Sequence, residues 1–172
     1  MLDRVERATA EVNPVHLAHP TLAAIKAYWD EKRGDRPMPS RAELDPSELK
    51  EHLGWICMLD ALPDYSDFRY RLVGTKVTRY FRVESTGKTI SEAFGAFGEG
   101  AVKGVLAIHR KVARDRVPLR AHGDAGWLGA AHQKFDALYL PLSNDGVSCN
   151  MILNAFIFDY ARVVAKSDSA LP

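Results

Sequence analysis

The chain has 172 residues, of which 47% are hydrophobic and 26% are charged, and its 23 basic and 22 acidic side chains leave a formal net charge of +1. This length and composition indicate a single globular domain and exclude an intrinsically disordered chain. The near balance of charge gives no electrostatic reason to expect nucleic acid or a membrane surface as a partner.

Residues 1–18 show no clear hydrophobic period, so we expect a loose leader there. The next segment, HPTLAAIKAYWDEKRG, predicts an amphipathic helix, because Leu22, Ile25 and Trp29 recur at helical spacing. The apolar stripe that these three residues form needs a surface to cover.

The segment LDPSELKEHLG predicts a second helix with a complete start signal. Asp45 can cap this helix, Pro46 suits its first position, and Glu48 stands where a capping box places its glutamate. These residues therefore have structural duties, and we expect no catalytic role for them.

Two strands are expected next, WICMLD and then FRYRLVGT. The second alternates apolar and charged residues, so one face should meet the core and the other the solvent. The apolar face consists of Phe68, Tyr70 and Leu72. We interpret Arg69 and Arg71 as solvated residues that form cross-strand ion pairs, with an anionic ligand or a partner's acidic patch as the alternative.

The middle of the chain predicts helices. Thr75 can cap a short one, and ISEAF indicates another after the turn ESTGKT. The apolar residues of these short pieces are Val77, Tyr80, Phe81, Ile90 and Phe94. Residues 99–114 show the strongest helical spacing and predict the longest helix, with Leu106 and His109 on its apolar stripe.

Three strands are predicted in the last third of the chain: RVPLRAHG, HQKFDALYLPL and VSCNMILNAFIFDY. The final strand is apolar on both faces, so both faces must be covered. One face holds Cys149, Met151, Leu153, Ala155 and Ile157, and the other holds Ile152, Phe156 and Phe158 beside Asn150 and Asn154. We expect the inserted helices to cover the first face. The helix with Trp29, from this chain or from a twin subunit, should cover the second.

Cys57 and Cys149 are too few and too far apart for a disulfide framework or a zinc motif, so we interpret them as reduced core thiols. The N-terminal stretch MLDRVERATAEVNP lacks the hydrophobic part of a signal peptide, and no apolar run approaches the ~20 residues of a membrane span. The sequence therefore predicts a cytoplasmic protein without a metal site.

The element order indicates an α+β domain built on antiparallel strands. The motifs RAELDP, FRYRLVGT and TGKTISE, in this succession, resemble a bacterial PAS-domain subgroup found mostly as small stand-alone proteins. The resemblance implies a five-stranded antiparallel sheet with short helices and one long helix on one face, plus N-terminal helices. It divides the chain into a leader (1–18), a PAS-like domain with its helical extension (19–160) and a tail (161–172).

The same resemblance implies a non-catalytic sensory or regulatory module that acts through small-molecule binding or protein–protein contacts. The ligand-binding wall would consist of Tyr70, Leu72, Val77, Tyr80, Phe81, Ile90, Phe94, Leu106, His109, Leu138, Met151 and Leu153. A homodimer is implied too, with an interface between the N-terminal helix and the sheet made of Leu22, Ile25, Trp29, Ile152, Phe156 and Phe158. Output would pass to a separate signalling protein.

The resemblance raises two cofactors, flavin and haem. A photoadduct flavin sensor needs a cysteine-bearing loop, and the corresponding segment here, KVTRYFRVESTGK, contains no cysteine, so we do not expect one. Some haem-binding PAS domains ligate iron through a histidine on the long helix, and His109 matches that position; the alternative is a histidine satisfied by a hydrogen bond. A further alternative is a small α+β barrel-type enzyme in which His109 works with Asp136 or Tyr139 as an acid–base pair.

Overall fold

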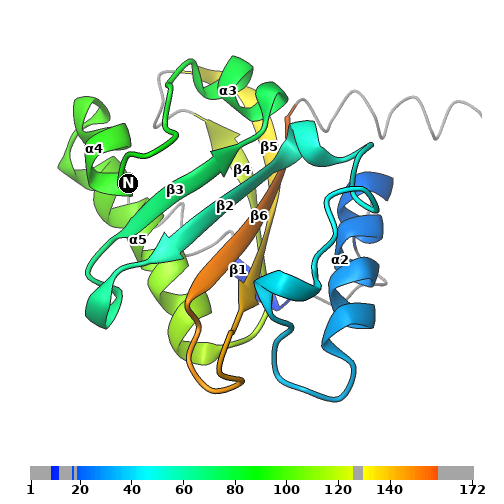
Figure 1. Ribbon diagram of the computed structural model, residues 1–172. Coiled ribbons are helices and arrows are strands. Elements are labelled where there is room, and N and C mark those ends of the chain that lie inside the picture. Colours follow the sequence, from blue (N-terminus) through cyan, green and yellow to red (C-terminus); the bar gives the residue numbers. More distant parts are fainter. Residues whose placement is uncertain (1–8, 12–16, 18, 126–129, 159–172) are drawn as a thin grey trace, which may run out of the picture.

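An antiparallel sheet forms the centre of the structure, a computed structural model that describes residues 9–11, 17, 19–125 and 130–158. In spatial order its strands are β1 (Thr9–Glu11), β4 (Leu119–Ala125), β5 (Ala130–Leu142), β6 (Met151–Phe158), β2 (Ile56–Ala61) and β3 (Phe68–Val73) (Figure 1). Five of these confirm the expected five-stranded sheet. The sixth, β1, pairs with β4, so the expectation of a loose leader is wrong for residues 9–11.

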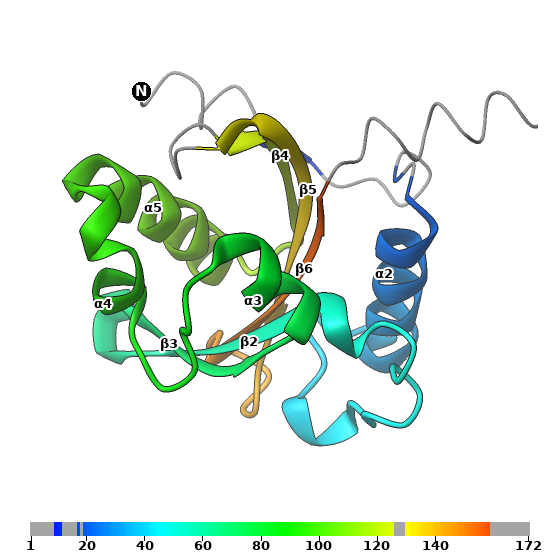
Figure 2. The ribbon, with the colours of Figure 1, turned by 90° about the horizontal axis from the view of Figure 1, so that it is seen from above.

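Helices lie on both sides of this sheet, and its antiparallel strand pairing confirms the α+β class. They are α2 (Pro20–Arg33), α3 (Thr75–Phe81), α4 (Ile90–Phe94) and α5 (Glu99–Asp115). Figure 2 shows α3, α4 and α5 on the concave side of the curved sheet and α2 on the opposite side. We call the side that carries α5 the inner face and the side that carries α2 the outer face.

Helix α2 has the start and stop signals that its sequence predicts. Pro20 occupies the first turn, and the helix ends at Gly34, whose φ of 56° lies in the region that glycine tolerates best. The residue that caps the helix is His19, whose ring Nδ1 accepts a hydrogen bond from the backbone N–H of Thr21.

The apolar stripe of α2 is buried against the sheet of its own chain. Leu22, Ile25 and Trp29 are all buried, and the indole N–H of Trp29 donates to the carbonyl of Pro141 in β5 at 3.0 Å. The cover for the stripe therefore comes from this chain and needs no twin subunit. A dimer interface built on these three side chains is not available in this fold.

The helix predicted for LDPSELKEHLG is wrong, because this segment forms turns followed by a short 3₁₀ turn, Leu53–Trp55. The residues of its start signal bind elsewhere. The carboxylate of Asp45 accepts from the N–H of Ser47, two residues on, and Glu48 reaches across to the hydroxyl of Tyr28 and the ammonium of Lys32 on α2. Because α2 takes the glutamate, no capping box closes.

A β-bulge interrupts the pairing of β2 with β3 and changes the direction of one predicted side chain. The register shifts between Met58 and Leu59, so β3 has an extra residue at this point. Alternation holds at Phe68 and Tyr70, which are buried, but Leu72 is 40% exposed. Leu72 therefore does not line the core, contrary to the sequence-based expectation.

Helix α3 starts one residue earlier than predicted, with Gly74 and not Thr75 at the cap position. Gly74 packs directly on the backbone of Gly54: a Cβ on Gly74 would lie 2.4 Å from the carbonyl oxygen of Gly54. The chain therefore makes this turn where only glycine fits, and the hydroxyl of Thr75 makes no capping hydrogen bond. Helix α4 does have a side-chain cap, a capping box formed by Thr89 and Glu92.

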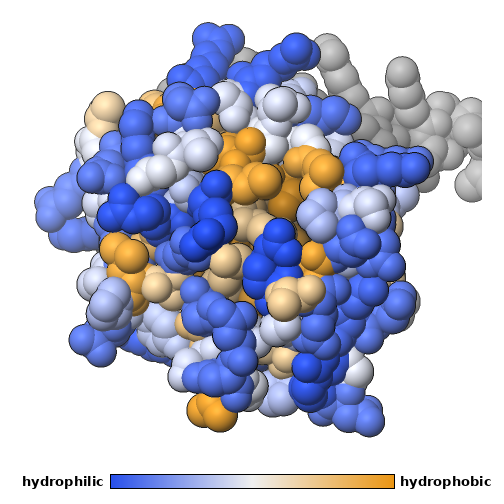
Figure 3. All heavy atoms as spheres, viewed as in Figure 1, coloured by the Kyte–Doolittle hydropathy of each residue, from blue (hydrophilic) through white to orange (hydrophobic). Residues whose placement is uncertain are grey.

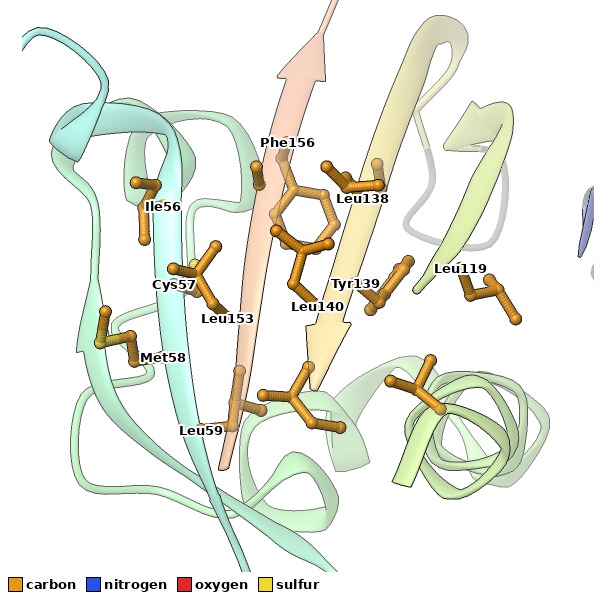
Figure 4. Close-up of a cluster of buried hydrophobic side chains, with 14 of the residues drawn as sticks. Ile56, Cys57, Met58, Leu59, Leu119, Leu138, Tyr139, Leu140, Leu153 and Phe156 are labelled. Atoms are coloured by element: carbon orange, nitrogen blue, oxygen red, sulfur yellow. The ribbon is translucent and has the colours of Figure 1, made fainter. Parts of the chain in front are cut away.

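All eight residues of β6 are buried, which confirms that this strand is covered on both faces. Helix α2 contacts β5 and β6 from the outer face, and α5 contacts β5 from the inner face. Figure 4 shows side chains of β2, β5 and β6 from this core, among them Leu138, Leu140 and Leu153. The candidate site lies on the inner face of the same strands.

Candidate functional site

A polar pair lies in the otherwise apolar layer between α5 and the inner face. His109 comes from the middle of α5 and Asn154 from the middle of β6, and both are buried. In the sheet register, Asn154 stands opposite Tyr139 on one side and Cys57 on the other. Directly paired residues of antiparallel strands project to the same face, so these three strand side chains share the inner face, where His109 of α5 meets Asn154.

The hydrogen bonds of His109 fix its protonation. Ring Nδ1 lies 2.8 Å from the carbonyl oxygen of Val105, and ring Nε2 lies 2.8 Å from the amide nitrogen of Asn154. A carbonyl oxygen only accepts, so Nδ1 carries the hydrogen and Nε2 of the neutral ring accepts from the Asn154 amide. Burial lowers the pKa of His109 from 6.5 to about 4, so the ring is neutral at pH 7.

This arrangement leaves one acceptor without a donor. With its nitrogen turned to His109, Asn154 presents its oxygen, Oδ1, to the core, where no described residue donates a hydrogen bond to it. Exchanging the amide oxygen and nitrogen would set the oxygen against the lone pair of His109 Nε2, so the orientation is fixed. A buried acceptor without a partner costs about 1–3 kcal/mol.

Two tyrosines and a thiol add further uncharged polar groups to the inner face. Burial raises the pKa of Tyr70 and of Tyr139 well above the usual value, and it raises the pKa of the Cys57 thiol to about 12. Across the part of the chain that the structure describes, neither tyrosine hydroxyl makes a hydrogen bond, since Tyr70 and Tyr139 enter only ring contacts. The polar groups of the site are therefore all neutral at pH 7.

Aromatic rings surround these groups. The imidazole of His109 lies 5.3 Å from the ring of Phe68 and 5.2 Å from that of Tyr139, centre to centre. Phe81 of α3 makes T-shaped contacts with Phe156 at 5.3 Å and with Phe94 of α4 at 5.8 Å, centre to centre. Edge-to-face contacts of this kind hold aromatic side chains in defined positions.

Eight of the predicted ligand-binding residues come from the inner-face helices or from the inner side of β3: Tyr70, Val77, Tyr80, Phe81, Ile90, Phe94, Leu106 and His109. The exposed Leu72 is not among them. Tyr70, Phe81, Phe94 and His109 belong to the ring cluster described above. Whether these residues bind a ligand stays a prediction.

The assignment of the two faces of β6 was reversed. Leu138, Met151 and Leu153 have the opposite parity to Tyr139 and Asn154 in the β5–β6 register, so they lie on the outer face and not in the predicted wall. Conversely Ile152, Phe156 and Phe158, predicted for the interface with the N-terminal helix, lie on the inner face. There Phe156 and Phe158 contact Phe81. Both faces of the strand are apolar, so alternation alone gave no preference.

The acid–base pair proposed for the enzyme alternative does not form. Asp136 lies on the outer face, where Arg120 holds both of its carboxylate oxygens at 2.8 and 2.7 Å. His109 is on the other side of the sheet. It does contact Tyr139, edge to face, but the hydrogen bonds of its ring go to Val105 and Asn154.

The haem hypothesis depends on a free ring nitrogen on His109, and the present arrangement does not offer one. Iron would have to take Nε2, the nitrogen that accepts from Asn154, while Nδ1 donates to Val105. The residues as they stand therefore do not fit haem ligation. Within the described ranges, no group of three or more histidine, cysteine or acidic side chains is placed to hold a metal ion.

Sequence reasoning missed Asn154, the residue on which the site is centred. The available signal was an asparagine within an eight-residue strand whose other members are all apolar. A buried polar side chain in such a strand needs a partner from the covering layer. His109, on the apolar stripe of the long helix, was the complementary signal.

Comparison with models of protein families finds a match to the family described as PAS domain, over residues 17–156, about four-fifths of the chain. The chain belongs to the PAS domain family. PAS domains are sensory and regulatory modules, and the antiparallel sheet with its helices agrees with the family fold. Comparisons with curated proteins and with solved structures gave no match. None of the helices that the structure describes is long and apolar enough to cross a membrane.

Proposed function

We propose that this PAS domain is a non-catalytic sensory or regulatory module that binds a small uncharged molecule between α5 and the inner face of its sheet. The observation that carries the proposal is the amide oxygen of Asn154, a buried acceptor that lacks a donor among the described residues. A guest with an N–H or O–H group would supply that donor. The new hydrogen bond to the amide oxygen would remove the cost of the unpaired acceptor and so favour binding.

The surroundings restrict the chemistry of the guest. His109, Tyr70 and Tyr139 are all neutral at pH 7, so these three groups supply no charge that could compensate an ionic ligand, and burying an unpaired ion is costly. The rings of Phe81 and Phe156 favour a flat aromatic guest. We therefore expect an uncharged aromatic molecule with at least one hydrogen-bond donor.

Output would pass through β5 to the outer face. Tyr139 of β5 faces the site, and two residues later the carbonyl of Pro141 accepts the hydrogen bond from Trp29 that fastens α2. A guest that moves Tyr139 would change the docking of α2, and a separate signalling protein would respond to the shifted population of α2 positions. The homodimer implied by the resemblance would need a surface other than the α2 stripe.

The first experiment asks what the purified protein carries. Native mass spectrometry and an absorbance spectrum of freshly purified protein should show a small neutral molecule, released on denaturation. The second compares two probes of nearly the same shape, indole, which has an N–H donor, and 1-methylindole, which has none. Because one hydrogen bond distinguishes them, indole should bind about tenfold more tightly.

Two variants make this test specific. Asn154→Leu alone would leave Nε2 of His109 as a new acceptor, so the test variant combines it with His109→Leu. This double variant keeps the branched outline at position 154 and removes both acceptors, so it should bind both probes equally. Leu153→Met, on the adjacent residue and the opposite face, should keep the preference for indole. The proposal fails if the native protein carries nothing and neither probe raises its melting temperature. It also fails if the double variant discriminates between the probes as the native protein does.

A further inference from the structure

Positive charge is concentrated in one part of this chain. Residues 68–89 contain six of the 23 basic side chains and only one of the 22 acidic ones, Glu84. The remainder therefore has 17 basic and 21 acidic side chains. A protein that is nearly neutral overall thus has one cationic segment and a slightly anionic rest.

The structure brings this segment to one edge of the sheet, with Arg71 and Leu72 toward the outer face of β3 and α3 on the inner side. β3 runs directly into α3 through Gly74, and Figures 1 and 2 show strand and helix next to each other at one end of the sheet. The loop that follows α3 returns to the edge of β3, where the guanidinium of Arg69 donates to the carbonyl of Gly87 and the backbone N–H of Tyr70 donates to the carbonyl of Lys88. We call the resulting patch the basic surface; its residues are Arg69, Arg71, Lys76, Arg79, Arg82 and Lys88, all exposed.

Most of this charge is not neutralised by the protein. Among the described residues, Arg71 has a carboxylate partner, Asp60, at 2.8 Å, and the other five members of the basic surface have none within 4.0 Å. Protection of an edge strand would explain arginines on β3, which is the last strand of the sheet. It does not explain Arg79 and Arg82 on α3 or Lys88 on the loop.

Apolar side chains lie within the basic surface. Leu72, which the bulge turns outward, is 40% exposed between Arg71 and the start of α3, and Trp55 lies half-buried with the ammonium of Lys76 4.5 Å from its ring centre. Figure 3 shows hydrophobic side chains next to strongly hydrophilic ones on the face that carries β2 and β3. An exposed apolar group within a charged patch is typical of a protein-binding surface.

We propose that the basic surface binds an acidic segment of another protein, one that carries apolar side chains between its glutamates or aspartates. Charge complementarity would steer and orient this partner, and Leu72 would pack against its apolar side chains. A nucleic acid fits less well. The rest of the chain is net negative, and the exposed apolar side chain of the basic surface, Leu72, offers no stacking surface to a base, while the ring of Trp55 is half-buried and lies against the ammonium of Lys76.

The test uses synthetic peptides and the full chain. A short peptide of glutamates interleaved with leucines is titrated by calorimetry at two salt concentrations, beside a peptide of equal charge with serine for leucine. The leucine peptide should bind, and more weakly at high salt. Arg79→Glu with Lys88→Glu should lower its affinity about tenfold, and Leu72→Ser about fivefold. The control pair Lys50→Glu with Arg114→Glu changes the net charge equally on other surfaces and should leave the affinity within about twofold.

Four results would overturn the proposal. Equal loss in the control pair would show an effect of net charge alone. Equal binding of the serine peptide would remove the role of Leu72. Tighter binding of a single-stranded or duplex oligonucleotide would point to nucleic acid, and a dimer that dissociates on charge reversal of the basic surface would show that a second copy is the occupant.

Discussion

Replacement of both members of the buried polar pair should be less harmful than replacement of His109 alone. His109→Leu leaves the amide nitrogen of Asn154 without its acceptor, in addition to the oxygen that already lacks a donor. Each buried unpaired group costs about 1–3 kcal/mol, so this variant should lose about 2 kcal/mol of unfolding free energy. The Val105 carbonyl that Nδ1 contacts stays within helix α5 and adds little to the loss.

Asn154→Leu has two opposing effects. It removes the unpaired oxygen, which stabilises the protein, and it leaves Nε2 of His109 as a new unpaired acceptor, so its net effect should be within about 1 kcal/mol. In the double variant no polar atom of the pair remains. The double variant should therefore be more stable than His109→Leu by about 1–3 kcal/mol, whereas for two independent side chains this difference would equal the effect of Asn154→Leu alone.

The assay is urea unfolding at pH 7, followed by tryptophan fluorescence, on ligand-free protein of all four sequences. Coupling is read as the departure of the double variant from the sum of the two single changes. The reasoning is refuted if the change in unfolding free energy of the double variant equals the sum of the two single changes within about 0.5 kcal/mol. It is refuted also if the double variant is less stable than His109→Leu.

Three further predictions concern other contacts. Because the pKa of His109 is lowered to about 4 in the folded protein, the unfolded chain binds more protons between pH 6.5 and 4, and stability should fall by about 3 kcal/mol as the pH drops through this window, measured by urea unfolding at each pH. Arg120→Met should cost about 3–5 kcal/mol, since it leaves Asp136 buried without its bidentate partner. Gly74→Ala should destabilise by more than 1 kcal/mol, because the new Cβ meets the backbone of Gly54.

Each of these three predictions has a matched control. The pH effect should be absent from His109→Leu, and a slope equal to that of the native protein would assign it to other groups. Arg69→Met removes an exposed guanidinium and should change stability by less than 1 kcal/mol; a loss as large as that of Arg120→Met would show that the buried pair is not special. Gly95→Ala meets no atom within 4 Å, so a melting temperature lowered as far as by Gly74→Ala would contradict the clash.

Local patterns in the sequence were enough to place most elements. The spacing of Leu22, Ile25 and Trp29 defined α2, and the alternation in FRYRLVGT defined β3, because both signals depend only on residues within a few positions of each other. The helix predicted for LDPSELKEHLG is wrong because this local signal does not include contacts with distant residues. Its cap residues find partners on α2, and no local pattern records a competing partner from elsewhere in the chain.

The candidate site required the tertiary structure. β6 is apolar on both faces, so the sequence could state that two layers must cover it but not which layer meets which face. The bulge that exposes Leu72 depends on the register with β2, and the separation of Asp136 from His109 depends on parity across β5.

By itself, then, the sequence determined the element types, the antiparallel α+β domain and its PAS resemblance, since hydrophobic period and turn residues act over short distances. Only the tertiary structure decided that His109 meets Asn154 and that one amide oxygen stays unpaired. This pairing depends on how helix α5 packs on the sheet, because that packing brings together side chains more than forty positions apart in the chain.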